Sequence, residues 1–147
     1  MHNFLKRTLV GFGLGICALS ASASPCDGSE IDIINQTSRD MQMITSEGYL
    51  ETSITPITVG DIVPAHGERT VTVRSGVGTN GDAKGLLAFR NQNTTDKHRF
   101  ISISFDFRNK VWLTCNKHAE VLNTLSDDFK VYTLPGYKSN VKVYIVE

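Results

Sequence analysis

Hydrophobic and polar residues alternate with a period of two along most of the chain, and turn-forming residues separate the alternating runs. This period is typical of strands that bury one face, and regular turns between short strands are typical of a β-sandwich. No run is followed by the helix that a strand-helix-strand unit would need, so we expect a single antiparallel β-sandwich of two layers. The runs predict about nine strands, over residues 30–35, 40–45, 54–63, 69–74, 85–90, 98–107, 110–114, 129–134 and 140–146.

Two parts of this pattern are irregular. Pro56 and Gly60 interrupt the run at 54–63, which we therefore expect to be an edge strand or to contain a bulge. Residues 118–129 could form a helix in place of a strand, because Val121, Leu122 and Leu125 lie near helical spacing. We assign at most a single helical turn to this segment. The expected core residues are Ile31, Ile33, Val71, Val73, Phe100, Ile103, Phe105, Val131, Val143 and Ile145.

The first 23 residues have the three zones of a signal peptide. Lys6 and Arg7 form a positive region, residues 8–19 are apolar and uncharged, and Ala21-Ser22-Ala23 fits a signal peptidase site. The apolar stretch is shorter than the roughly 20 residues that span a membrane. We therefore predict a cleaved signal peptide, residues 1–23, a mature β-sandwich domain, residues 24–147, and no transmembrane helix in the mature chain.

The predicted location is secreted or periplasmic. The compact signal peptide indicates a bacterial protein, so the sequons at Asn35 and Asn93, which matter only in a eukaryotic secretory pathway, are discounted. Cleavage removes two basic residues and no acidic one, which leaves 13 basic and 15 acidic side chains and a net charge of −2. This charge argues against a nucleic-acid partner and against a polybasic membrane patch.

Cleavage also removes Cys17 and leaves two cysteines, Cys26 and Cys115. In an exported protein an even pair of cysteines is most simply a disulfide. The alternative, two metal or redox thiols, is disfavoured because the chain has no CxxC motif and no histidine at zinc-ligand spacing from either cysteine. A bond between Cys26 and Cys115 would join the start of the mature chain to a late strand.

No motif in the sequence points to catalysis. The mature chain retains His66, His98 and His118, but it has no G-x-S-x-G or HExxH motif. The loop at 75–85 has glycines at G-x-G-x-x-G spacing, yet a strand-like segment follows it, where a dinucleotide site needs a helix N-terminus. We therefore predict a protein that is not an enzyme and has no cofactor, metal or catalytic residue.

Three aromatic residues lie beside turn signals and are the expected binding residues: Tyr49, Trp112 and Tyr137. Amphipathic rings in such loops contact membrane interfaces, sugars or partner proteins. For Trp112, the one tryptophan of the chain, packing in the core is the alternative interpretation, because half-buried strands also favour aromatic residues.

Six segments of the chain resemble the aegerolysin and actinoporin-like group of secreted β-sandwich proteins. They are EIDIINQTSRDM, DIVPAHGERTVTV, GVGTNGDAKG, GLLAFRN, ISISFDF and FKVYTLPGYKSNVKVYIV. The first contains the I-x-N-x-T pattern at Ile33, Asn35 and Thr37. The resemblance implies a β-sandwich that binds membrane lipids. One departure is the single tryptophan, since such lipid binders usually present several at one end.

Two functions follow from these observations. The first is an exported, non-enzymatic binding protein whose loops contact a membrane lipid or a cell surface, as the aegerolysin-like resemblance implies. The alternative is a periplasmic or secreted protein-interaction or inhibitor domain that recognises another exported protein through an exposed edge strand, suggested by the broken run from Pro56 to Val63.

Overall fold

The structure is a computed structural model that describes residues 25–49, 51–76, 80–96, 98–110, 114–124, 129–135 and 140–147. The expected signal peptide, residues 1–23, lies outside the described residues. The described residues form ten strands: β1 (Ser29–Asn35), β2 (Met41–Tyr49), β3 (Ser53–Thr55), β4 (Ile62–Val63), β5 (Glu68–Arg74), β6 (Ala83–Asn91), β7 (Ile101–Lys110), β8 (Thr114–Thr124), β9 (Lys130–Leu134) and β10 (Val141–Val146). Among them is no helix long and apolar enough to cross a bilayer.

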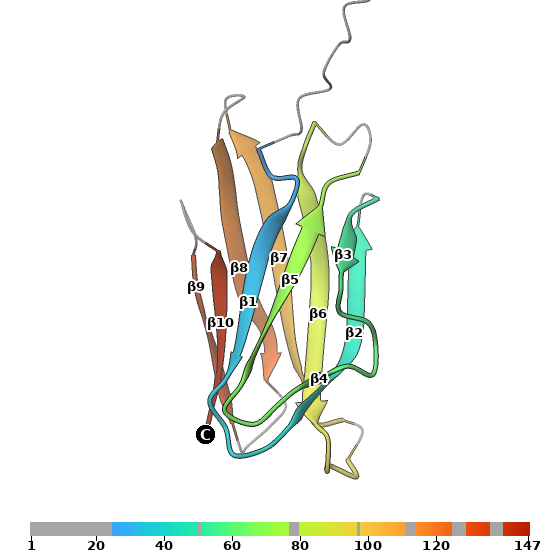
Figure 1. The fold of residues 1–147 in the computed structure, drawn as a ribbon, viewed down its shortest axis with the longest axis vertical. Coiled ribbons are helices and arrows are strands. Elements are labelled where there is room, and N and C mark those ends of the chain that lie inside the picture. Colours follow the sequence, from blue (N-terminus) through green and yellow to red (C-terminus); the bar gives the residue numbers. More distant parts are fainter. Residues whose placement is uncertain are drawn as a thin grey trace, which may run out of the picture.

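The strands form two sheets of five that pack face to face (Figure 1). Sheet A has the order β3-β5-β1-β10-β9, and sheet B has the order β4-β2-β6-β7-β8. The predicted all-β sandwich is therefore confirmed. One neighbouring pair departs from the expected antiparallel arrangement, because β1 and β10 run parallel in the middle of sheet A. Both strands begin at the same end of the sandwich, and β10 lies between β1 and the antiparallel β9.

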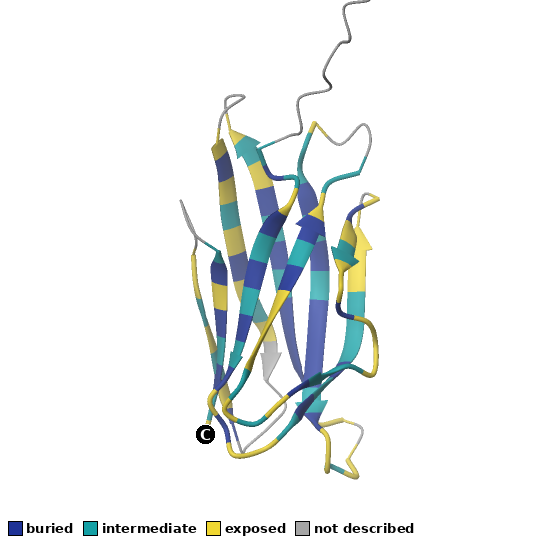
Figure 2. Ribbon diagram, viewed as in Figure 1, coloured by how far each residue is buried: buried dark blue, intermediate teal, exposed yellow. Residues whose placement is uncertain are grey.

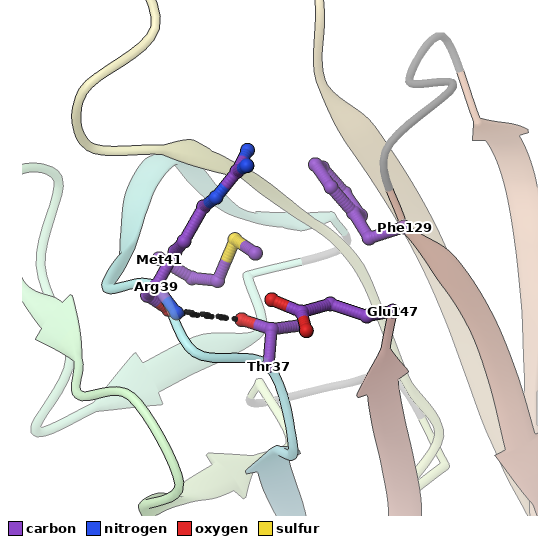
Figure 3. Close-up of a pocket in the computed structure, with 5 residues that line it drawn as sticks. All are labelled: Thr37, Arg39, Met41, Phe129 and Glu147. Carbon is purple, nitrogen blue, oxygen red and sulfur yellow. Dashed lines mark hydrogen bonds between the residues drawn. The ribbon is translucent and has the colours of Figure 1, made fainter.

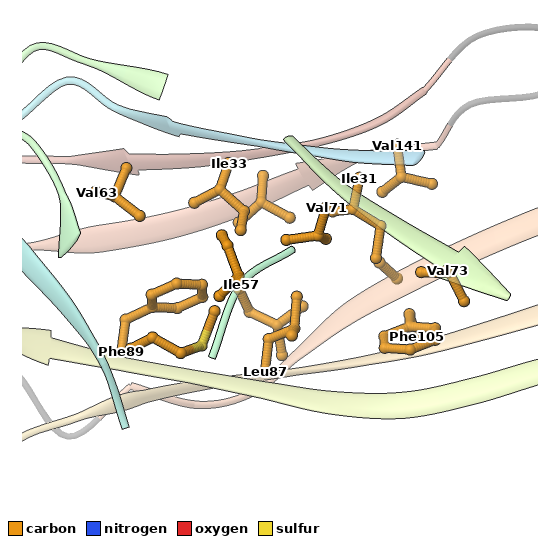
Figure 4. Packing of buried hydrophobic residues seen from close by; sticks show 14 of the residues in the cluster. Ile31, Ile33, Ile57, Val63, Val71, Val73, Leu87, Phe89, Phe105 and Val141 are labelled. Carbon is orange, nitrogen blue, oxygen red and sulfur yellow. The ribbon is translucent and has the colours of Figure 1, made fainter. Parts of the chain in front are cut away.

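The core lies between the sheets and follows the period of two. In β1 every second residue is buried, and β10 repeats this pattern beside it (Figure 2). Ile31 is in register with Val141 and Ile33 with Val143, so their side chains form adjacent rows on the inner face of sheet A. Figure 4 shows these rows facing residues of sheet B such as Phe89.

Eight of the ten expected core residues are buried, and the exceptions are Phe100 and Val131. Val131 is half-buried and packs against the core. The expectation for Phe100 is wrong. Strand β7 begins one residue later, and its buried apolar residues are the odd-numbered ones from Ile101 to Phe107, beside the buried Ser102. Phe100 is therefore out of phase with the apolar inner face.

The helical turn expected within 118–129 is wrong for residues 118–124, because β8 continues to Thr124, and residues 125–128 lie outside the described residues. The residues of β8 from His118 onward are paired with β7. Ala119 is buried and Val121 packs against the core, whereas Leu122 is 56% exposed, which is the alternation of a strand. Of the separate strand expected at 110–114, residues 111–113 lie outside the described residues. Its two ends belong to different strands, since Lys110 ends β7, Thr114 begins β8, and these two residues are paired.

The broken run at 54–63 crosses from one sheet to the other. Its first part belongs to β3, the edge of sheet A, and its last part to β4, the edge of sheet B. Between them are a cis peptide bond before Pro56 and the side chain of Ile57, which is 3% exposed and part of the core cluster. The predicted edge position is confirmed, and the segment closes one flank of the sandwich.

The predicted disulfide between Cys26 and Cys115 is confirmed, with the two Cα atoms 4.9 Å apart. Cys26 lies in the turn before β1 in sheet A, and Cys115 lies in β8 at the edge of sheet B. Both cysteines are buried. The bond therefore clamps the two sheets together at one end of the sandwich.

Candidate functional site

The strand termini that flank the expected binding residues lie at one end of the sandwich. We call it the disulfide end, because the Cys26–Cys115 bond lies there. Strands β2, β5, β7 and β9 end there, and β1, β6, β8 and β10 begin there (Figure 1, top). The register pairs that bring these termini together are Tyr49 with Lys84, Ala83 with Phe107, Lys110 with Thr114, Ser29 with Val73, and Leu134 with Lys142.

Tyr49 is the last residue of β2 and is 48% exposed. Its register partner is Lys84, which points outward between two buried neighbours, so both side chains lie on the outer face of sheet B. The turn that follows is fixed by hydrogen bonds, since the Thr52 N–H donates to the Tyr49 carbonyl (3.0 Å) and the Lys84 N–H donates to the Thr52 hydroxyl (3.1 Å). Tyr49 is thus presented by a strand and an anchored turn.

The other two expected binding residues, Trp112 and Tyr137, lie outside the described residues. The described residues that flank Trp112 are Lys110 and Thr114, where the Thr114 hydroxyl donates to the Lys110 carbonyl (3.0 Å). Leu134, which ends β9 at the disulfide end, precedes Tyr137 in the chain. The segments that contain these two aromatic residues therefore start from the same end of the sandwich as Tyr49.

A row of charged side chains lies beside Tyr49 on the outer face of sheet B. Lys84 is paired in register with Asp106, and Asp106 is paired with His118. The Lys84 ammonium is 3.5 Å from the Asp106 carboxylate, which also accepts hydrogen bonds from Arg108 at 2.7 and 3.0 Å. Two cations share one carboxylate here, so this group carries a net positive charge.

The environment of Asp106 favours its ionised form. The side-chain hydrogen bond from Arg108 lowers the pKa of Asp106, partial burial opposes this effect, and the charge of Lys84 lowers the pKa further. The alternation within β6 and β7 places these residues at outward positions, a signal that sequence reasoning missed. Their grouping depends on strand register, which the sequence pattern alone does not define.

The glycine-rich loop before β6 has no helix after it. Asn80 and Gly81 have positive φ angles of 53° and 84°, and β6 begins at Ala83. The Asn109 side chain donates to the Asn80 carbonyl (3.1 Å), and the Asn109 N–H donates to the Asp82 carboxylate (2.8 Å). These residues form a turn between strands, as expected, and the helix N-terminus of a dinucleotide site is replaced by a strand.

A small pocket lies at the opposite end, where β10 ends. It has a volume of about 200 Å³ and is lined by Thr37, Arg39, Met41, Phe129 and Glu147 (Figure 3). Figure 3 shows Met41 between Arg39 and Phe129, with the Glu147 carboxylate directed toward Thr37 and Arg39. These residues come from distant parts of the chain, so no sequence motif could indicate this pocket.

Hydrogen bonds from Ser38 hold Glu147 at the rim of this pocket. The Ser38 hydroxyl and the Ser38 N–H, at 2.9 Å, both donate to one carboxylate oxygen of Glu147. These bonds lower the pKa of Glu147, burial opposes this effect, and the charge of Arg39 lowers the pKa further. The pocket therefore combines an apolar base with an ionised carboxylate and a guanidinium group.

A buried asparagine fixes the chain reversal at this end. Asn35 is 1% exposed, and its side-chain nitrogen donates to the carbonyls of Arg39 (2.8 Å), Val63 (3.1 Å) and Pro64 (3.0 Å). Its side-chain oxygen accepts from the N–H and the hydroxyl of Thr37, at 3.0 and 2.8 Å. Asn35 belongs to one of the two sequons, and its role here is structural.

The histidines are dispersed over the fold. His66 lies in the turn before β5, His98 before β7, and His118 in β8, where its side chain is 3.8 Å from Glu120. Within the part of the chain that the structure describes, no group of three or more histidine, cysteine or acidic residues is arranged to hold a metal ion.

Comparison with known proteins relates the chain to others through its fold. No protein-family model matches it, and no curated protein matches its sequence. The crystal structure of RahU protein in complex with a TRIS molecule matches with a TM-score of 0.62 at 11% identity, over 84% of this chain and 97% of that one. The crystal structure of IP-1A from Alcaligenes faecalis matches with a TM-score of 0.56 at 11% identity, over 85% and 94% of the two chains. The chain therefore shares their β-sandwich fold.

Proposed function

We propose that this protein is an exported, aegerolysin-like binding protein that contacts a membrane lipid or a cell surface through the disulfide end. One observation carries the proposal, namely that Tyr49 and the strand ends flanking Trp112 and Tyr137 meet at this end. Tyr49 ends β2 at this end, and the segments that contain Trp112 and Tyr137 follow β7 and β9 where these strands end there, as a single contact surface requires.

The groups beside Tyr49 suit a lipid headgroup. A tyrosine ring has an apolar body and a polar hydroxyl, which is why tyrosine is common at membrane interfaces. Lys84 and Arg108 supply two cations around Asp106, and a headgroup phosphate is an acceptor for such cations. The disulfide between Cys26 and Cys115 supports a location outside the cytosol, because disulfides persist in oxidising compartments.

Co-sedimentation with liposomes tests this function. The purified protein is mixed with vesicles of phosphatidylcholine, of phosphatidylcholine with phosphatidylserine, and of sphingomyelin with cholesterol. We expect it to pellet with at least one composition, and we expect the substitutions Tyr49→Ser, Trp112→Ala and Tyr137→Ala each to reduce the pelleted fraction. No pelleting with any composition would contradict the proposal.

Two control variants separate this surface from general hydrophobicity. Tyr132 is 45% exposed on sheet A, so Tyr132→Ser removes a ring of similar exposure from the other sheet. Leu122 is 56% exposed near the opposite end of β8, so Leu122→Ser removes an apolar group far from the disulfide end. Both variants should pellet like the unmodified protein, and an equal loss in Tyr49→Ser and the controls would count against a defined contact surface.

The protein-interaction alternative has weaker support at the edge from Pro56 to Val63. The edge strands there, β3 and β4, are three and two residues long, so they offer few backbone groups to a partner strand. The backbone of the intervening turn is already bonded to β2, because the Met43 N–H donates to the Asp61 carbonyl and the Gly60 N–H to the Met43 carbonyl, both at 2.8 Å.

A further inference from the structure

A second pocket lies on the flank of sheet B, where β2 meets the turn before β4. Its volume is about 290 Å³, close to the lower limit for small-molecule sites. The residues that line it are Gln42, Met43, Ile44, Val59, Gly60 and Arg90. None of them belongs to the disulfide end or to the pocket of Figure 3. Every residue of this lining lies in the described part of the chain.

The wall of this pocket is a firmly bonded turn. The Thr58 N–H donates to the Asp61 carboxylate (2.8 Å), and the Asp61 N–H donates to the Thr58 carbonyl (3.1 Å). Two further hydrogen bonds join Gly60 and Asp61 to Met43 of β2. At the tip, Val59 is 65% exposed, the largest value among the large hydrophobic residues that the structure describes. A fixed turn therefore holds an aliphatic side chain at the rim of the pocket.

The polar side of the pocket is an oriented guanidinium group. Arg90 in β6 is the register partner of Gln42 in β2, and both point outward between buried neighbours. Two nitrogens of Arg90 donate to the Gln42 side-chain oxygen, at 3.0 and 3.3 Å. Among the described residues, no carboxylate forms an ion pair with Arg90. The positive charge is thus held in place by a neutral partner and is not neutralised.

We propose that this pocket binds a small anionic ligand that carries a short aliphatic part. Its carboxylate or phosphate group would accept hydrogen bonds from Arg90, because an arginine fork matches the geometry of both groups. Its aliphatic part would lie against Ile44 and Val59, which would cover exposed apolar surface. The small volume limits the ligand to a short chain. This proposal does not depend on lipid binding at the disulfide end.

Titration of the ¹⁵N-labelled protein with sodium hexanoate, followed by NMR, tests the site. We expect saturable shifts of the amides of residues 42–44, 59 and 60 and of the Arg90 side-chain N–H, with a dissociation constant in the millimolar range. Hexyl phosphate is titrated in the same way. Comparison of its dissociation constant with that of hexanoate shows whether the site prefers a phosphate or a carboxylate group. Hexanol, which has the same chain without a charge, should cause no saturable shift at these residues.

Substitution of Gln42 by Glu tests directly whether the charge of Arg90 is needed for binding. Gln42→Glu keeps the shape of the side chain but places a carboxylate on Arg90, which would occupy the guanidinium group from within the protein. We expect this variant to weaken hexanoate binding by at least about tenfold, the loss of one charge-assisted contact. Because no buried group is changed, it should fold like the unmodified protein. Arg74→Gln removes an exposed arginine from sheet A and should leave binding unchanged.

Each outcome decides the proposal. Saturable shifts with either anion that are lost in Gln42→Glu and kept in Arg74→Gln support it. The anion that binds more tightly then identifies the preferred anionic group. No saturable shift with either anion, equal binding of hexanol, or undiminished binding by Gln42→Glu would overturn it. Failure of the liposome experiment would leave this result unaffected, since the two experiments probe different residues.

Discussion

The ring of Phe105 in β7 lies directly over the Cα of Gly85, its register partner in β6. A Cβ atom at Gly85 would overlap with this ring and would approach the Glu47 carbonyl oxygen to 2.5 Å. A glycine within a strand is normally a weakness, because it adds no side chain to the packing. Here the lack of a side chain leaves a space next to Gly85, and the ring of Phe105 fills that space.

Replacement of Gly85 by alanine should therefore destabilise the protein. We expect Gly85→Ala to lower the free energy of unfolding by about 1–3 kcal/mol, because the added methyl group overpacks the core against Phe105 and the backbone of β2. Urea unfolding measures this change. In a Phe105→Leu background the cost of Gly85→Ala should be smaller, and an equal cost in both backgrounds would show that the ring is not the obstacle.

The buried Asn35 should be essential for stability. Replacement by alanine leaves three backbone carbonyls and the Thr37 hydroxyl without the partner they have now. We expect Asn35→Ala to lower the free energy of unfolding by at least about 2 kcal/mol. The asparagine of the other sequon, Asn93, is exposed, so Asn93→Ala should change stability by no more than about 0.5 kcal/mol. Similar effects of the two substitutions in thermal or urea unfolding would contradict this assignment.

The disulfide should supply a large part of the stability. Cys26 and Cys115 are 89 residues apart, and on the chain-entropy account closing such a loop stabilises the folded state by about 4–5 kcal/mol. Urea unfolding with and without dithiothreitol measures this contribution. The double variant Cys26→Ala, Cys115→Ala should be destabilised to a similar extent and should not respond to the reductant. A protein equally stable in both conditions would contradict the prediction.

Stability should depend on the ionisation of Asp106 at acidic pH. Arg108 and Lys84 lower its pKa in the folded state below the ordinary value of 3.8. A lowered carboxyl pKa contributes stability above the unfolded-state pKa, and this contribution is lost as the pH falls through the folded-state pKa. Unfolding experiments should show Asp106→Asn to be less stable than the unmodified protein near neutral pH, with the difference shrinking below about pH 3.8. A difference that grows toward low pH would contradict this account.

The period of two was sufficient to predict the sandwich and most of its core, because each strand buries one face. It placed Phe100 wrongly, since the run at 98–107 contains apolar residues of both phases and only pairing with β6 selects the odd ones. It also missed β8 beyond His118, where the adjacent Val121 and Leu122 fit a helix as well as a strand. Pairing with β7 satisfies the backbone there and selects the strand.

The candidate sites were less predictable than the fold. Tyr49 could be identified because turn residues follow it, but its neighbours Lys84 and Asp106 depend on register between strands that are distant in the sequence. The same holds for Gln42 and Arg90, 48 residues apart, whose contact arises from cross-strand pairing. Register depends on turns and on the whole buried face, so the sequence pattern predicts which residues point outward but not which of them meet.

The parallel pairing of β1 with β10 has a consequence for the order of folding. The first and the last of the described strands in chain order are neighbours in the middle of sheet A. This sheet therefore cannot be completed until β10 is available. Contacts of such long sequence separation slow folding, because a long loop must be ordered before they form. A chain that completes sheet A only after residue 146 has emerged would stay open during synthesis, and the export proposed above would benefit from this, because a secretion channel passes chains in an extended form.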